Sequence, residues 1–176
     1  RSERKKWIHC FENVSCLLYT ISLTEYAALC WEDSDENRLV ESLRLFAEIA
    51  NTKWFSETPK ILLLTRAEIM QHTMQRCRFG SVFPEYTGND LDYASVVSFI
   101  KDMFMKKYKG DRKLILPVIV DCLDENRMKE VIRIIVDVSI TENVSRYVFE
   151  AWNPNCSSMS LFSEDRMKLE RFYDIT

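Results

Sequence analysis

Few residues in this sequence have the type and spacing of a catalytic or metal-binding site. The two histidines, His9 and His72, are far apart and have no Glu or Cys at the spacing of a zinc ligand, which argues against a zinc site or a Cys–His nucleophile. The three glycines form no phosphate loop of the GxxxxGK type, whose backbone N–H groups would cradle phosphates. The sequence therefore predicts no complete catalytic site and no metal site within this chain.

The composition is typical of a folded domain in a reducing compartment. At 176 residues, with 47% hydrophobic side chains, the chain is long enough to bury a sizeable core. The 24 Lys and Arg nearly balance the 27 Asp and Glu, so no nucleic-acid partner is expected. The six cysteines form no CxxC pair, and no apolar run reaches the roughly 20 residues of a membrane span. We expect an intracellular protein with reduced thiols.

Hydrophobic periodicity predicts alternating strands and helices. Apolar residues recur at helical spacing between residues 37 and 50, and the run at 60–64 is typical of a buried strand in a parallel sheet. Pro117 restricts its own strand to a sheet edge or a bulge. Further elements are expected as a basic amphipathic helix at 2–11, strands at 14–23 and 113–122, and helices at 67–77 and 91–108. The pattern predicts an α/β fold of three layers, a mostly parallel sheet with helices on both faces.

Three blocks of the sequence carry a resemblance to a known family. They are RSERKKWIHCFE at 1–12, the helix and aromatic turn at 37–55, and FPEYTG at 83–88. In their order and spacing they resemble the alpha subunit of heterotrimeric G proteins. The resemblance implies that 1–152 is the carboxyl-terminal half of a P-loop GTPase (Ras-like) domain, and that 153–176 is a divergent tail with a short helix near 164–173.

The resemblance also implies which chemistry belongs to the whole protein. GTP or GDP and Mg²⁺ are the expected cofactors, but the family's phosphate loop, Mg²⁺ ligands and catalytic arginine precede the segment that matches Arg1. Positioning and charge stabilisation by those groups supply nearly all of the rate of phosphoryl transfer. This chain alone is therefore expected not to hydrolyse GTP.

Recognition of the guanine base is the part of the family's site that falls in this half. The family's Asn-Lys-x-Asp, whose carboxylate accepts hydrogen bonds from guanine N1–H and the exocyclic amine, corresponds to Thr65-Arg66-Ala67-Glu68. Glu68 keeps the charge but adds a methylene, Arg66 keeps a long stem, and Thr65 loses the amide. We weigh equally the interpretation that these residues only end a strand and begin a helix.

The second base-reading loop is ambiguous because a pattern is repeated. Both 119–126 and 135–143 contain Ile-Val-Asp followed by Glu-Asn, either by coincidence or because two alternative terminal exons have been joined. Spacing favours the first copy, which places Cys122 at the backbone donor, whereas local identity favours the second, which places Val138 there. If the first copy is authentic, 114–120 is buried and the following helix has an inward stripe of Met128, Val131, Ile132 and Ile135.

The first block predicts partner contacts, because it matches the family's second switch helix. The residues expected to contact a βγ dimer or an effector are Arg4, Lys5, Lys6, Trp7 and Cys10, with inward packing of Trp7 and Cys10 as the alternative. The resemblance implies a GTP-dependent switch in G-protein-coupled receptor signalling, at the cytoplasmic face of the plasma membrane, attached through a segment before Arg1. The altered base-reading residues favour a second hypothesis, a pseudo-GTPase adaptor that binds βγ or effector without nucleotide control.

Overall fold

The computed structural model describes residue 11, residues 14–31 and residues 35–152, with the side chains of the last helix described up to residue 141. Residues 1–142 form one unit, which contains the whole described sheet, and residues 143–176 form a second. The described strands, α-helices and 3-10 helices (η) are, in chain order, β1 (Leu17–Ser22), η2 (Leu23–Ala27), α2 (Arg38–Ala50), η3 (Lys53–Phe55), β2 (Lys60–Thr65), α3 (Ala67–Arg76), α4 (Phe79–Val82), α5 (Tyr93–Lys107), η4 (Arg112–Leu114), β3 (Ile115–Ile119) and α6 (Glu125–Trp152). The short helix predicted near 164–173, and all but the last residue of the helix predicted at 2–11, lie outside the described residues.

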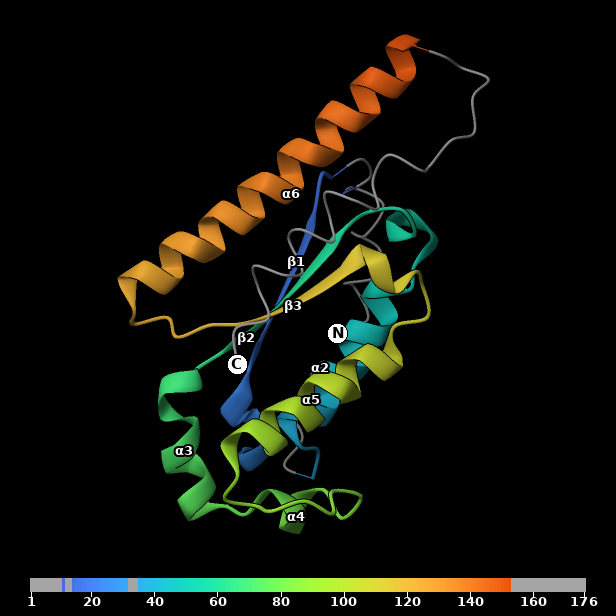
Figure 1. The fold of residues 1–176 in the computed structure, drawn as a ribbon. Helices are drawn as coiled ribbons and strands as arrows, with labels where there is room; N and C mark the ends of the chain where they lie inside the picture. The colour runs from blue at the N-terminus through green and yellow to red at the C-terminus, as the bar shows by residue number, and fades with distance from the viewer. Residues whose placement is uncertain (1–10, 12–13, 32–34, 153–176) are drawn as a thin grey trace. The chain divides into compact units, whose positions relative to one another are not determined.

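Three parallel strands form the described sheet, in the order β1–β2–β3 (Figure 1). β2 is the central strand, and its first five residues are buried, as expected for a continuous apolar run. β3 lies at one edge of this sheet, which accommodates Pro117 because an edge strand has one row of backbone groups without a strand partner. The predicted α/β fold is confirmed, and of the two positions predicted for Pro117, a sheet edge or a bulge, the structure shows the edge.

One face of the sheet is covered by α2 and α5, which lie side by side (Figure 1). The apolar stripe predicted for α2 is buried, and it shares one core with Leu62 and Leu64 of β2. α2 begins at this point because the Asn37 side chain accepts hydrogen bonds from the N–H groups of Leu39 and Val40, at 2.9 and 3.4 Å. The buried side chains of the two helices are Leu39, Leu43, Phe46, Ala50, Val96, Val97, Ile100 and Phe104.

The opposite face of β2 is also apolar. Because side chains alternate along a strand, Ile61 and Leu63 point away from the core that holds Leu62 and Leu64, and both are buried. A parallel strand with two apolar faces needs cover on both of them. This face is therefore a second packing surface of the unit that ends at Glu142.

The burial predicted for β3 and α6 is confirmed only in part. Val131 and Ile134 are the buried side chains in the described part of α6, whereas Ile132 is 54% exposed. Residues 132 and 134 are about 200° apart around a helix, so the two cannot face the same surface. The predicted burial of 114–120 holds only in part, since β3 is an edge strand and its last residue, Ile119, is 45% exposed.

The last strand-to-helix turn is the first copy of the repeated pattern, at 119–126. The Val120 N–H donates to Leu64 O at 2.8 Å, which extends the pairing of the third strand with the second. Asp124 Oδ1 then accepts hydrogen bonds from two N–H groups in the first turn of α6, and so caps that helix. The second copy, at 135–143, lies inside α6, so it supplies no strand.

Lys60, the first residue of β2, is an almost fully buried lysine. Its ammonium donates to the backbone oxygens of Phe55 and Thr58, at 2.5 and 2.7 Å, and lies 5.1 Å from the centroid of the Tyr108 ring. Burial lowers the pKa of Lys60 to about 8, against smaller opposing effects of Glu57 and Cys16. The Lys60 side chain therefore links η3 and the end of α5 to the sheet. Because burial disfavours the charged ammonium, the free energy cost of this arrangement depends on whether Lys60 is protonated.

We expect the free energy of unfolding to rise by about 1–2 kcal/mol between about pH 7.5 and pH 9.5. In the unfolded chain Lys60 keeps its proton up to its ordinary pKa near 10.5, whereas the folded protein releases it near pH 8. The unfolded state therefore binds more protons in this window, and stability increases with pH. Urea unfolding at the two pH values measures the change. Lys60→Met should flatten the slope, and a slope that persists in this variant would assign the effect to other groups.

Candidate functional site

The two loops expected to recognise the guanine base follow neighbouring strands. Residues 65–68 come directly after β2, and residues 120–123 come directly after β3. The two strands are parallel and in register, with Leu64 opposite Ile119. Their carboxyl ends therefore meet at one edge of the sheet, which is where open α/β folds place their ligands.

Thr65 and Arg66 shape the turn from β2 into α3. The Thr65 hydroxyl donates to Ile21 O at 2.8 Å, which ties the end of β2 to the end of β1. Arg66 has φ 63° and ψ 34°, the one left-handed conformation of a non-glycine residue in the described part of the chain. Such a conformation costs about 1–2 kcal/mol and recurs at functional sites. Burial raises the pKa of the Glu25 carboxyl, and the charges of Arg38 and Arg66 partly offset this effect.

Glu68 lies in the first turn of α3, where the helix dipole favours a negative charge. Its Oε2 atom is buried and has no hydrogen-bond partner among the residues that the structure describes. Burying a carboxylate oxygen without a hydrogen-bond donor costs free energy. This atom is therefore a candidate acceptor for a donor that the described residues do not supply.

Tyr93, the first residue of α5, belongs to the same site. Burial raises the pKa of its phenol, and the nearby charges of Glu68 and Asp121 raise it further. One charged residue from each of the two loops, Glu68 and Asp121, therefore lies close enough to this phenol to influence its pKa. Sequence reasoning missed Tyr93, and no local signal identifies it, because only the packing of α5 against the sheet brings it to the strand ends.

The turn after β3 is built on Asp121. Its Oδ1 accepts from the Leu123 N–H at 2.9 Å, a local turn that holds the chain before α6 begins. Cys122, predicted at the backbone donor, is an exposed free thiol in this turn, and its role stays a prediction. The alternative at Val138 was wrong as a turn position, because that residue is partly buried inside α6.

Other expected features fall outside this edge of the sheet. The predicted partner contacts Arg4, Lys5, Lys6, Trp7 and Cys10 lie outside the described residues. Within the described ranges, no three or more His, Cys, Asp or Glu side chains come together in a way that would hold a metal ion. No helix in those ranges is both long and apolar enough to cross a membrane.

Comparison with known proteins decides which family has this arrangement. The family model for the G-protein alpha subunit matches residues 1–139, from the first residue to a point inside α6. The chain belongs to the G-protein alpha subunit family. The match includes both strand-end loops of the candidate site and leaves residues 140–176 outside.

Individual members of the G-protein alpha subunit family are similar to this chain over most of its length. The guanine nucleotide-binding protein alpha-2 subunit of Mycosarcoma maydis is 36% identical over 144 residues, which are 82% of this chain and 40% of that protein. The G(o) subunit alpha of Lymnaea stagnalis is 38% identical over 144 residues, with the same coverage. The alpha-17 subunit of Caenorhabditis elegans is 35% identical over 147 residues, 83% of this chain and 41% of that protein. The chain thus spans about two fifths of the length of these relatives.

Proposed function

We infer that this chain forms the base-recognition side of a guanine-nucleotide-binding alpha subunit, with Glu68 as the residue that accepts hydrogen bonds from the base. The observation that carries the proposal is the buried, unpartnered Oε2 of Glu68 at the carboxyl ends of β2 and β3. Membership of the family supports the same assignment. The relatives that share this half are named as guanine nucleotide-binding proteins.

The residues present fit a donor-rich base. Guanine offers two adjacent donors, N1–H and the exocyclic amine, and an ionised carboxylate has two oxygens that accept both. The turn at 120–123 follows β3 at the same edge of the sheet, and the Cys122 N–H in this turn is the donor proposed for the guanine carbonyl. A bound guanine nucleotide with Mg²⁺ would supply the phosphoryl-transfer chemistry, and Glu68 would hold the base of that nucleotide.

We extend the proposal to signalling. The whole protein acts as a nucleotide-dependent switch at the cytoplasmic face of the plasma membrane, and its partners are a βγ dimer, a receptor and an effector. The family of the chain supports these roles. The residues proposed for partner contact are the basic and aromatic side chains of the first block, Arg4, Lys5, Lys6, Trp7 and Cys10.

Glu68→Gln is expected to weaken guanosine binding by about tenfold or more, because the amide replaces one acceptor oxygen with a donor. Saturation-transfer NMR on the 176-residue chain detects millimolar binding and gives the dissociation constant. Inosine, which lacks the exocyclic amine, should bind the unmodified chain more weakly than guanosine. Glu130→Gln, at an exposed carboxylate of α6, is the matched control. Equal guanosine affinity in both variants would remove Glu68 from the site.

A pseudo-GTPase adaptor is the second candidate, and specific contacts favour it. The Thr65 hydroxyl already donates to Ile21 O, and the Leu123 N–H already donates to the Asp121 carboxylate, so neither group can donate to a base without rearrangement. The chain would then show no measurable preference between guanosine and adenosine, yet it would still retain purified βγ dimer in a pull-down assay.

A further inference from the structure

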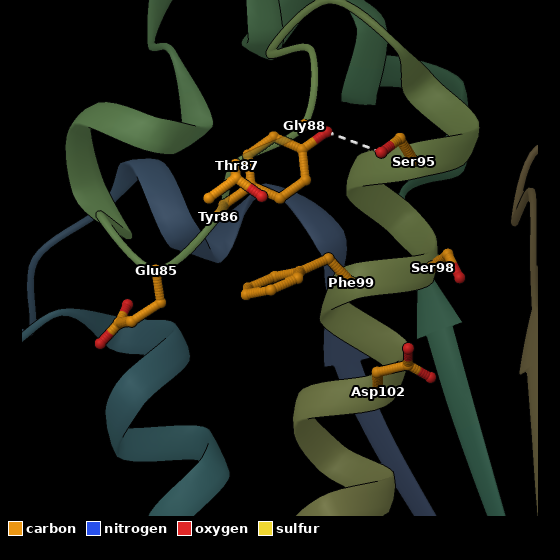
Figure 2. A pocket seen from close by; sticks show the side chains of 8 residues that line it. All are labelled: Glu85, Tyr86, Thr87, Gly88, Ser95, Ser98, Phe99 and Asp102. Atoms are coloured by element: carbon orange, nitrogen blue, oxygen red, sulfur yellow. Dashed lines mark hydrogen bonds between the residues drawn. The ribbon is translucent and has the colours of Figure 1, made fainter.

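A groove separate from the strand-end site lies between α5 and the loop that precedes it (Figure 2). Its volume is about 390 Å³, near the lower end of the roughly 300–1,000 Å³ of ligand sites. The loop is the FPEYTG motif at 83–88, which the proposed function does not use. The lining residues are Glu85, Tyr86, Thr87, Gly88, Ser95, Ser98, Phe99 and Asp102.

The walls of the groove are held in place before any ligand arrives. Tyr86 is buried, and its hydroxyl lies 2.9 Å from Asn89 O and 2.8 Å from Ser95 Oγ, which fastens the loop to α5. The Tyr86 ring also meets the Phe99 ring edge-to-face, with centroids 5.2 Å apart. At Gly88 an added Cβ would come within 2.5 Å of Tyr86 Oη and 2.8 Å of Ser95 Oγ, so only glycine fits there.

The chemistry of the groove is acidic around an aromatic ring. Ser95, Ser98, Phe99 and Asp102 follow the i, i+3, i+4, i+7 pattern along α5 and therefore share one face of that helix. Glu85 lies on the opposite wall, and Figure 2 shows the Phe99 ring between the Glu85 and Asp102 side chains. The groove has two carboxylates and no Lys or Arg in its lining.

This combination selects for a planar cation. An aromatic face attracts a cation through its quadrupole, and a guanidinium stacks on it more readily than an ammonium. The rim carboxylates accept charge-assisted hydrogen bonds from its N–H fork, and the serine hydroxyls accept further ones. A metal ion suits the groove poorly, because two carboxylates on either side of a ring do not converge on one point.

We propose that the groove between 85–88 and α5 binds an arginine side chain, presented by an extended basic segment of a partner protein. Charge complementarity identifies the occupant, and the preformed walls reduce the ordering cost of binding. The lining of the groove contains none of the residues assigned to the strand-end site, although α5 contributes to both.

The probe is the synthetic peptide Gly-Ser-Arg-Gly-Arg-Ser-Gly, titrated into the ¹⁵N-labelled 176-residue chain and followed by NMR. Shifts are expected at the amides of Gly88, Ser98 and Phe99. The same peptide with citrulline in place of arginine keeps the shape and loses the charge, and it should produce no saturable shift. The lysine peptide should bind at least about threefold more weakly, since the ammonium lacks the stacking plane. Equal binding of the citrulline or the lysine peptide overturns the proposal.

Two variants in the groove and one control on α6 locate the binding. Asp102→Asn removes one carboxylate from an exposed position and should raise the dissociation constant of the arginine peptide by about tenfold. Asp137→Asn makes the same change on α6, away from the groove, and should leave the constant within about twofold. Phe99→Leu should weaken binding as well, and its folding is checked by the amide spectrum. Equal weakening by Asp102→Asn and Asp137→Asn would show non-specific attraction to an acidic chain and would sink the proposal.

Discussion

Replacing Phe79 with alanine is expected to lower the free energy of unfolding by about 3–5 kcal/mol. Phe79 has no exposed surface, and its ring is the centre of an aromatic cluster. The rings around it belong to Tyr26, Phe83, Tyr86 and Phe99, with centroids 5.0, 4.9, 5.2 and 5.7 Å away. Truncation removes all four contacts and leaves a cavity that the short helix α4 cannot fill.

Urea unfolding followed by circular dichroism measures this loss. Trp31→Ala is the control, because Trp31 is fully exposed and its removal should change the free energy of unfolding by less than about 0.5 kcal/mol. A loss below about 1 kcal/mol for Phe79→Ala would mean that the cluster of α4, η2 and α5 does not carry the stability of the domain.

The second large effect is expected at Ile134 of α6, and Ile132 on the same helix is its control. Ile134→Asp is expected to cost more than about 3 kcal/mol, because Ile134 is 3% exposed and an unpaired carboxylate there loses its hydration. Ile132→Asp makes the same chemical change on the same helix at a side chain that is 54% exposed, and it should cost less than about 1 kcal/mol.

Thermal melts of the two variants, side by side, compare the faces of α6 directly. The helix propensity of the introduced residue is the same in both, so the difference between them isolates burial. Similar losses in the two variants, or a larger loss for Ile132→Asp, would contradict the way α6 packs and with it the assignment of the first copy as the last strand-to-helix turn.

One part of the candidate site could be predicted from the sequence, and the other part depends on the tertiary structure. Thr65, Arg66 and Glu68 could be placed at a strand end from the apolar run before them, because strand ends and helix starts have local signals. The left-handed turn at Arg66 and the unpartnered oxygen of Glu68 have no such signal. Tyr93 joins these residues only because α5 packs beside the sheet, through contacts between residues far apart in the chain.

For the fold, the sequence determined the alternation of strands and helices, the buried stripe of α2 and the restriction of Pro117 to a sheet edge or a bulge, since each follows from a periodicity or from one residue's backbone chemistry. For α6, it placed Ile132 in the inward stripe, whereas Ile134 is the buried residue. α6 carries apolar side chains at 131 and 134 and again at 132, 136 and 140, so both sets satisfy a helical period. Tertiary packing decided between them, because periodicity specifies which residues share a face but not which face meets the sheet.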